Sequence, residues 1–160
     1  MQKIRVICVG HIKEKFYTQA VEEYSKRLSR YCRLEITELA DEKTPDNASD
    51  AMNDRIKEKE GDRILAAIPE GAYVIALAIE GRMCDSVELS KKLESLGVEG
   101  HGSIVFIIGG SLGLDRRVLD RADYKLSFSR MTFPHQLMRV ILLEQVYRAY
   151  RISNNEPYHK

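Results

Sequence analysis

Short, almost uninterrupted apolar runs are the feature that most limits how this chain can fold. They read IRVICV at residues 4–9, YVIALAI at residues 73–79 and IVFII at residues 104–108. A strand with one solvated face alternates apolar and polar residues, whereas a continuous apolar run is typical of a strand buried on both faces. Such strands occur in parallel sheets that helices cover on both sides. The runs therefore predict a sheet enclosed between two layers of helices.

Helical segments separate these runs along the chain, so strands and helices are expected to alternate. This alternation predicts one α/β domain, residues 1–160, with a mostly parallel sheet of five to six strands. We predict strands at residues 4–9, 34–39, 73–79, 104–108 and 124–128, with the third ending at Glu80-Gly81. We predict helices at residues 14–31, at 48–68, from a cap at Asp85 or Ser86 to Gly97, after Asp115, and from Pro134 onward.

Two local features are given their simplest interpretation. In the second helix, Met52, Ile56 and Ile64 are expected to face inward, and the KEKE run at residues 57–60 is expected to be a solvated helical face. His135, in the first turn of the last helix, is expected to be a capping or packing residue.

Composition excludes several classes of protein. The chain is 44% hydrophobic and 31% charged, with no apolar window long enough to span a bilayer, so we expect no membrane partner. Cys8, Cys32 and Cys84 are odd in number and widely spaced. This spacing argues against a disulfide framework or a zinc site and favours the reducing cytoplasm. No cluster of His, Asp and Glu has metal-ligand spacing, so no metal is expected.

The distribution of charge says more than the net charge of +1. Residues 124–160 hold six Lys or Arg against two Glu, while residues 41–62 hold eight Asp or Glu against four Lys or Arg. A basic C-terminal end is compatible with phosphate contact. A solvated surface without a partner explains it equally well, so both interpretations stay open.

The last helix carries an unusually wide apolar arc, which sweeps roughly 200° where a single core needs about 100°. We therefore expect it to bury one surface on its own sheet and a second on a partner. Arg139 falls in the middle of the arc. A buried guanidinium is costly unless paired, so we expect it to meet an anion or a carboxylate. The alternative is that Arg139 extends out of the arc into water.

Three loops follow the carboxyl ends of predicted strands, where ligands of parallel sheets bind. They are Glu80-Gly81, the glycine-rich residues 109–113 and residues 129–133, and together they predict one cleft. The sequence GGSLG is neither the dinucleotide fingerprint nor a phosphate-binding P-loop. Its glycines could serve a ligand that lies against the backbone or a tight turn that the fold requires.

Several motifs together carry a resemblance to a known family. They are VGHIKEKF at residues 9–16, LAIEG at 77–81, IGGSLG at 108–113, FSRMTFPHQLMRVILLEQVYRA at 128–149 and the terminal YHK at 158–160. With them the chain resembles the RlmH family, bacterial methyltransferases of the SPOUT class. The resemblance covers nearly the whole chain, and no motif position departs from it.

This resemblance implies a homodimeric α/β fold with a deep trefoil knot near the C-terminus. It implies a cytoplasmic enzyme that methylates N3 of pseudouridine 1915 in 23S rRNA of the assembled ribosome, with S-adenosylmethionine as cofactor and no DNA partner. By position in the sequence, the resemblance places the cofactor site at the strand-end loops described above. Its residues are Leu77, Gly109, Phe128, Ser129, Arg130, Met131, Thr132 and Phe133.

The terminal motif and two arginines complete the expected site. Because the resemblance includes the tail, Tyr158 and His159 are expected to fold over a cleft, in the same or the other subunit, and to orient the base or accept its proton. Arg139 is the candidate for an electrostatic contact near the site, and Arg130 for an RNA phosphate.

Two other functions remain as alternatives. One is a flavodoxin-like or Rossmann-like nucleotide binder that uses the glycine-rich loop for phosphate, and the missing fingerprint counts against it. The other is a ribosome-binding module that kept the fold and lost the chemistry. The intact cofactor loops and tail count against that module.

Overall fold

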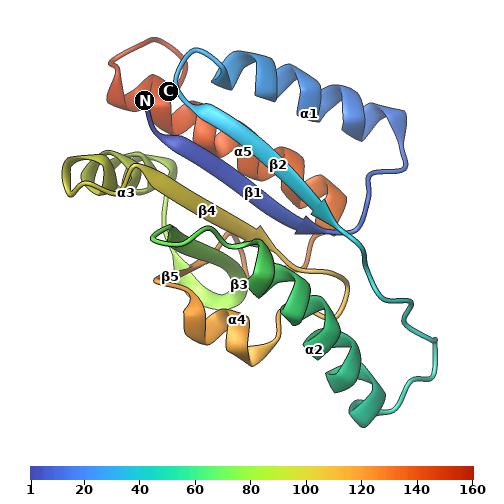
Figure 1. Cartoon of the computed structure of the whole chain (residues 1–160). Helices are drawn as coiled ribbons and strands as arrows, with labels where there is room; N and C mark the ends of the chain where they lie inside the picture. The colour runs from blue at the N-terminus through green and yellow to red at the C-terminus, as the bar shows by residue number, and fades with distance from the viewer.

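The computed structural model describes all 160 residues and contains one five-stranded sheet with the order β2-β1-β4-β3-β5. Every neighbouring pair of strands is parallel, as expected (Figure 1). The strands are β1 (Lys3–Val9), β2 (Arg33–Leu39), β3 (Tyr73–Met83), β4 (Ser103–Ile108) and β5 (Tyr124–Ser127). The helices are α1 (Lys15–Leu28), α2 (Asp50–Ala67), α3 (Ser86–Val98), α4 (Arg116–Arg121) and α5 (His135–Ser153).

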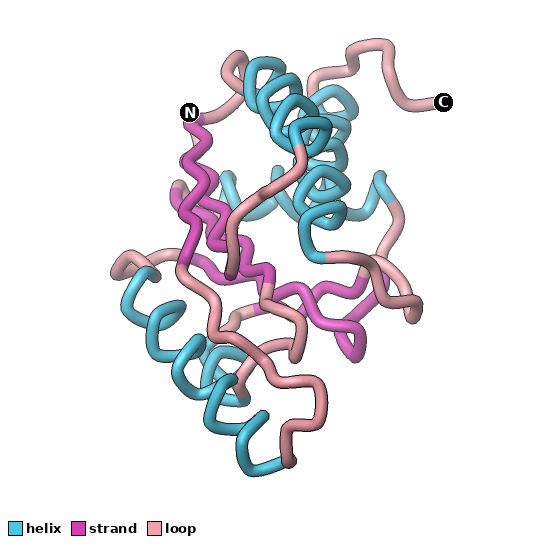
Figure 2. The backbone as a smooth tube through the Cα atoms, turned by 90° about the vertical axis from the view of Figure 1, so that its right-hand side faces the viewer, coloured by secondary structure: helices cyan, strands magenta, loops and turns pink.

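The helices cover the two faces of the sheet unequally. On one face, α1, α3 and α5 pack over a core of 17 buried residues that includes Ile4, Phe106 and Leu142. On the other, α2 and α4 cover a core of eight that includes Val105 and Ile64. Figure 2 shows the strands between these two groups of helices. Both faces of the central strands are therefore buried, which is the physical reason for their continuous apolar sequences.

α5 lies on the larger core, between α1 and α3 (Figure 1). Its N-cap is Pro134, whose ψ of 134° is extended, so the helix begins at His135 rather than at the proline. The buried side chains of α5 are Arg139, Leu142, Leu143, Val146 and Ala149. The wide apolar arc is thus filled by the sheet and by two helices of the same chain. The expected contact with a partner remains a prediction.

β3 differs from the expected strand because it continues past Glu80-Gly81. Its pairing with β5 breaks after Leu77 and resumes at Arg82, both opposite Leu126, so residues 78–81 bulge out of the ladder. At this bulge the backbones of β3 and β5 lie very close together. A Cβ on Gly81 would lie 2.7 Å from the carbonyl oxygen of Lys125, a clash that only glycine avoids.

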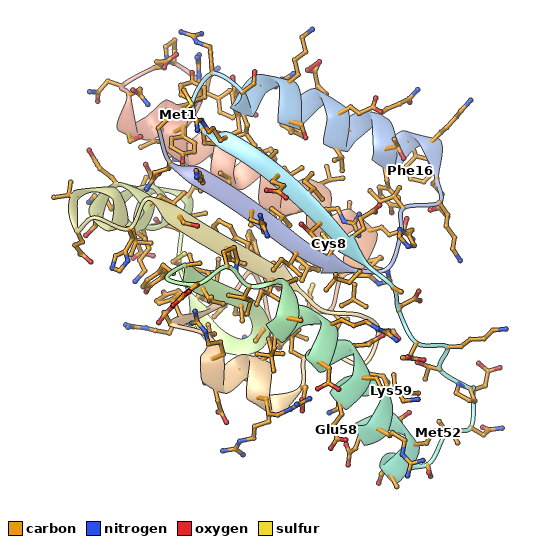
Figure 3. The ribbon with its side chains drawn as sticks, in the orientation of Figure 1. Met1, Cys8, Phe16, Met52, Glu58 and Lys59 are labelled. Atoms are coloured by element: carbon orange, nitrogen blue, oxygen red, sulfur yellow. The ribbon has the colours of Figure 1, made fainter.

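α2 corrects the simple interpretation of the KEKE run. Glu60 is 5% exposed and belongs to the buried face with Ile56, Gly61 and Ile64. Glu58 and Lys59 are exposed, and Figure 3 labels both on this helix. Met52, expected to face inward, is 46% exposed, because the N-terminal turn of α2 extends beyond the sheet (Figure 1). Only half of the charged run is therefore a solvated face.

The cysteines lie where small apolar residues would. Cys8 is buried within β1 (Figure 3), Cys32 is buried before β2, and Cys84 is half-buried after β3. None of them forms a disulfide. No helix has the length and apolar character needed to cross a lipid bilayer.

Candidate functional site

One cleft lies at the carboxyl ends of β4 and β5 and at the bulge within β3, where the sequence predicted the third strand to end. Its volume is about 460 Å³, within the range of small-molecule sites. Three chain segments supply most of its walls: residues 77–80 from the β3 bulge, the glycine loop (residues 108–114) and the elbow (residues 128–133). Lys57, Leu119, Leu126, His135 and Met138 complete the lining. Segments far apart in the sequence therefore converge on one apolar cleft.

The glycine loop is both a tight turn and a wall of the cleft, so the two interpretations left open by the sequence do not compete. The Gly113 N–H donates to the Gly110 carbonyl at 3.1 Å, and Gly113 has a φ of +85° that favours glycine. A Cβ on Gly109 would lie 2.9 Å from the side chain of Leu114. The loop thus presents bare backbone to the cleft, which lets a flat ligand lie close to peptide groups.

The elbow is shaped by short local hydrogen bonds. The Ser127 hydroxyl donates to the Ser129 carbonyl at 3.1 Å, and the Met131 N–H donates to the Ser129 hydroxyl at 3.0 Å. Met131 is left 74% exposed beside the cleft. An exposed thioether and the half-buried Phe133 ring give this wall an apolar surface suited to a planar ring system.

Arg139 meets a carboxylate, as predicted, and the alternative of a solvated head group is wrong. Its side chain is 1% exposed, donates to Glu38 at 2.5 Å and to the Gly10 carbonyl at 3.3 Å. Burial raises the pKa of the Glu38 carboxyl, but hydrogen bonds from Arg139, His11 and the Ile12 N–H outweigh it and hold that pKa below its usual value. Arg139 therefore ties α5 to the ends of β1 and β2 and does not line the cleft.

His135 lines the cleft one helical turn before Arg139. Its ring packs beside Gly10, with Nε2 3.5 Å from the position that a Cβ on Gly10 would take, and the φ of +96° at Gly10 favours glycine there. Burial lowers the pKa of His135, and the positive charge of Arg139 lowers it further. The imidazole is therefore neutral at physiological pH. It offers the cleft one donor and one acceptor without a charge.

Glu60 presses against the back of the glycine loop from α2. Its carboxylate accepts a hydrogen bond from the Glu42 N–H at 3.0 Å, and its Oε1 would lie 3.1 Å from a Cβ on Gly110. Burial raises the pKa of the Glu60 carboxyl, and the nearby Asp41 and Glu42 add to that effect. Glu60 thus connects the position of α2 to the shape of the glycine loop.

The C-terminal tail (residues 156–160) is fixed to α5. Glu156 accepts hydrogen bonds from the Tyr31 hydroxyl at 2.9 Å and forms an ion pair with Arg151. Arg151 also donates to the Pro157 carbonyl at 2.9 Å. These contacts join the tail to α5 and to the segment between α1 and β2, so the tail has a defined path.

Tyr158 and His159 dock on the middle of α5. The Tyr158 hydroxyl donates to Glu144 at 3.2 Å, and its ring packs edge-on against Tyr147 and under Arg148. Burial raises the pKa of Tyr158, and the neighbouring Glu144 raises it further. Arg148 Nη1 lies 3.1 Å from His159 Nδ1. Because a guanidinium only donates, Nδ1 accepts, and the proton of a neutral ring lies on Nε2.

The tail does not reach the cleft of its own chain. Met138 of α5 lines the cleft, whereas Arg148 holds His159 ten residues later. This separation is roughly 15 Å along the helix.

The structure brings together seven of the eight predicted cofactor residues. Arg130 is the exception: its side chain is exposed, is not among the lining residues and forms no ion pair. The other seven, Leu77, Gly109, Phe128, Ser129, Met131, Thr132 and Phe133, all line the cleft. None of the predicted catalytic residues lines the cleft: Arg139 is paired with Glu38, and Tyr158 and His159 dock on α5.

Sequence reasoning did not assign His135 or Lys57 to the cleft. His135 had been interpreted as a capping or packing residue and Lys57 as part of a solvated face, whereas Glu80 had been placed in a strand-end loop of the predicted cleft. Helical spacing was the available signal for Lys57, since it lies three and four residues before the buried Glu60 and Gly61. No group of three or more His, Cys, Asp or Glu side chains is arranged to hold a metal ion.

Comparison with known proteins adds a family to this geometry. A family described as "Predicted SPOUT methyltransferase" matches residues 2–159. A protein named ribosomal RNA large subunit methyltransferase H from Clostridium novyi (strain NT) is 62% identical over 157 residues, covering 98% of this chain and 99% of that protein. One of the same name from Bifidobacterium adolescentis is 61% identical over 158 residues, covering 99% of each chain.

A solved structure shares the fold at low sequence identity. It is titled as that of a "probable methylase family protein" from Haemophilus influenzae Rd KW20 and superimposes with a TM-score of 0.55 at 13% identity. The match covers 98% of this chain and 70% of that one. At this identity the likeness concerns the fold alone.

Proposed function

Because the chain belongs to the SPOUT methyltransferase family, we propose that it methylates ribosomal RNA of the large subunit and holds S-adenosylmethionine in the cleft. The target we propose is N3 of pseudouridine 1915 in the 23S rRNA of the assembled ribosome. The observation that carries the proposal is the convergence of the β3 bulge, the glycine loop and the elbow on one cleft of about 460 Å³.

The residues present fit such a cofactor. A flat, largely apolar adenine ring suits a cleft that offers Leu77, Phe133 and the exposed Met131. The backbone of the glycine loop, which lines the cleft, can meet the polar edge of the ring with its N–H and C=O groups. When bound, S-adenosylmethionine supplies a methyl group already activated by its sulfonium.

The chain's own task is to align N3 of the base with that methyl group and to remove the imide proton. Alignment alone can lower the barrier by several kcal/mol. Loss of the proton leaves a negative charge on the base, which nearby donors stabilise. The protonated Tyr158 hydroxyl and the Nε2–H of His159 are donors of this kind. Arg139, already paired with Glu38, acts by holding the end of β1 and α5 in place.

A homodimer would bring the tail to a cleft. Tyr158 and His159 lie roughly 15 Å along α5 from the cleft of their own chain, so we propose that they serve the cleft of a second copy. His159 orients the base while Arg148 occupies its Nδ1, and it can accept a proton there only after releasing Arg148.

A transfer assay tests the proposed activity. Large ribosomal subunits, whole ribosomes and free 23S rRNA from cells that lack this enzyme are incubated with the protein and methyl-labelled S-adenosylmethionine. We expect label in the rRNA of whole ribosomes and little in free rRNA. Absence of label from all three substrates would contradict the proposal. A thermal-shift panel of S-adenosylmethionine, FMN and NAD separates the proposal from the other nucleotide-binding folds.

Removal of residues 158–160 tests the role of the tail. We expect methyl transfer to be abolished, while the affinity for S-adenosylmethionine stays nearly unchanged because no tail residue lines the cleft of its own chain. Unchanged turnover would refute the role.

Arg130→Ala tests the proposed phosphate contact, with Arg116→Ala on α4 as the control. Both arginines are exposed, but Arg116 lies within 3.9 Å of Asp120, whereas Arg130 has no acidic partner. We expect Arg130→Ala to weaken ribosome binding and to reduce its salt slope by about one. If neither quantity changes, Arg130 is a surface charge only.

A further inference from the structure

We infer that Lys57 of α2 binds the carboxylate of the amino-acid portion of S-adenosylmethionine. This inference rests on the proposed function, and it concerns a residue that lies outside all of the family motifs described above. Lys57 is the only lysine or arginine among the residues that line the cleft. Arg139 does not line the cleft and is paired with Glu38.

The ammonium group of Lys57 has no firm partner within the chain. Its nearest carboxylate oxygen belongs to Asp54, at 3.9 Å, on a side chain that is 72% exposed. An exposed pair at this distance contributes little. The Lys57 side chain itself is only 32% exposed, because it leans against the cleft wall. The charge is therefore partly shielded from water and free to pair with a ligand.

The position of Lys57 is fixed by the contacts on either side of it. Arg117 of α4 donates to the Glu58 carbonyl at 3.0 Å and pairs with Asp62 at 2.9 Å. A Cβ on Gly61 would lie 2.9 Å from Asp115, so α2 approaches the start of α4 as closely as backbone allows. α2 is thereby held against the glycine loop, and Lys57 is presented at a constant place.

Charge identifies the ligand group. S-adenosylmethionine carries two positive centres, the sulfonium and the amino group, and a single negative one, the carboxylate. The cleft walls are otherwise apolar side chains, hydroxyls and backbone, apart from Glu80 and the neutral His135. An anionic oxygen entering the cleft therefore finds one cation, which is Lys57. Hydrogen bonds to charged groups in a partly desolvated site are among the stronger ones.

The experiment measures binding by calorimetry with two thioethers, S-adenosylhomocysteine and 5′-methylthioadenosine. Both contain the adenosine and a neutral sulfur, but only the first has the amino-acid portion. We expect Lys57→Met to weaken S-adenosylhomocysteine about tenfold and to leave methylthioadenosine nearly unchanged. Lys57→Arg should restore most of the lost affinity. Lys59→Met, on the exposed side of the same helix (Figure 3), is the matched control and should change neither ligand.

Each other outcome has a distinct meaning. Equal weakening of both ligands by Lys57→Met would overturn the inference, because the lysine would then support the adenosine or the shape of the cleft. Unchanged binding of both, with ribosome binding that is weaker and less salt-dependent, would also overturn it in favour of an RNA phosphate. If the unaltered protein binds neither thioether nor S-adenosylmethionine, the proposed function itself fails, and the Lys57 variants play no part in that result.

Discussion

The two faces of the sheet differ in the size of their cores and in the environment that each gives to a glutamate carboxylate. The face covered by α1, α3 and α5 buries 17 residues, and next to it Glu38 is held ionised by Arg139. The face covered by α2 and α4 buries eight, and there Glu60 lies buried without a basic hydrogen-bond partner. The first face can therefore serve as a rigid base for α5 and the tail. The second holds the glycine loop through a less stable contact.

The largest expected effect compares one core residue from each face. Leu142 is fully buried on α5 between two helices and the sheet, and Ile64 is 1% exposed on α2 over the smaller core. We expect Leu142→Ala to lower the free energy of unfolding by about 4 kcal/mol and Ile64→Ala by about 2.5 kcal/mol, because a cavity near a smaller core can collapse more fully. Urea denaturation of both variants measures the difference. A larger loss for Ile64→Ala would break the comparison.

The next effect concerns the ion pair that borders the larger face. Arg139→Met removes both contacts of the guanidinium and leaves Glu38, which is 33% exposed, for water to solvate. We expect a loss of about 3 kcal/mol in the free energy of unfolding at neutral pH. Arg139→Lys is the control, since it keeps the charge without the two-pronged geometry, and it should lose less. Full stability of Arg139→Met would mean that the pair does not hold α5 to the ends of β1 and β2.

The smallest expected effect concerns Glu38→Gln and Glu60→Gln, which should change the free energy of unfolding in opposite directions. The pKa of Glu38 is lower in the folded chain than in the unfolded chain. Its ionised form therefore stabilises the fold at pH values above the unfolded-chain pKa, and this stabilisation disappears as pH falls through the folded-chain pKa. The pKa of Glu60 is raised, so its ionised form destabilises the fold at neutral pH, and that penalty disappears as pH falls towards the unfolded value.

Glu38→Gln should therefore destabilise the chain at pH 7.5 by about 2 kcal/mol, because the buried Arg139 charge loses its carboxylate although an amide oxygen can still accept from it. Glu60→Gln should stabilise the chain by less than about 1 kcal/mol. The Glu60 difference should shrink as pH falls towards the unfolded carboxyl pKa of about 4.5, whereas the Glu38 difference should persist there and disappear only at lower pH. Denaturant unfolding at pH 7.5, at about pH 4.5 and below it measures both differences. Two changes of the same sign would show that the faces do not differ in their electrostatics.

The order of strands and helices could be predicted from local sequence. The features that could not be predicted lie where segments far apart in the sequence come together. Continuous apolar runs require burial on both faces, so the parallel sheet and all five strands were predictable. The extension of β3 to Met83 was not predictable, because the second pairing with Leu126 follows a register shift that no local pattern encodes. The knot likewise was expected from family resemblance and not from periodicity.

The site shows the same division. Leu77, Gly109 and Phe133 were predictable because strand-end loops meet at one edge of a parallel sheet. Lys57 was missed because its neighbours Glu58 and Lys59 are indeed solvated. Lys57 lines the cleft only because α2 approaches the start of α4 closely at Gly61. The ion pair of Arg139 was predictable as a need for an anion, but the identity of Glu38, 101 residues away, was not.

The most direct test of the proposed function is mass-spectrometric mapping of methylated nucleotides in 23S rRNA after ribosomes lacking this modification are incubated with the protein and S-adenosylmethionine. We predict one added methyl group, on N3 of pseudouridine 1915. No added methyl group, or one on a different nucleotide, would contradict the account.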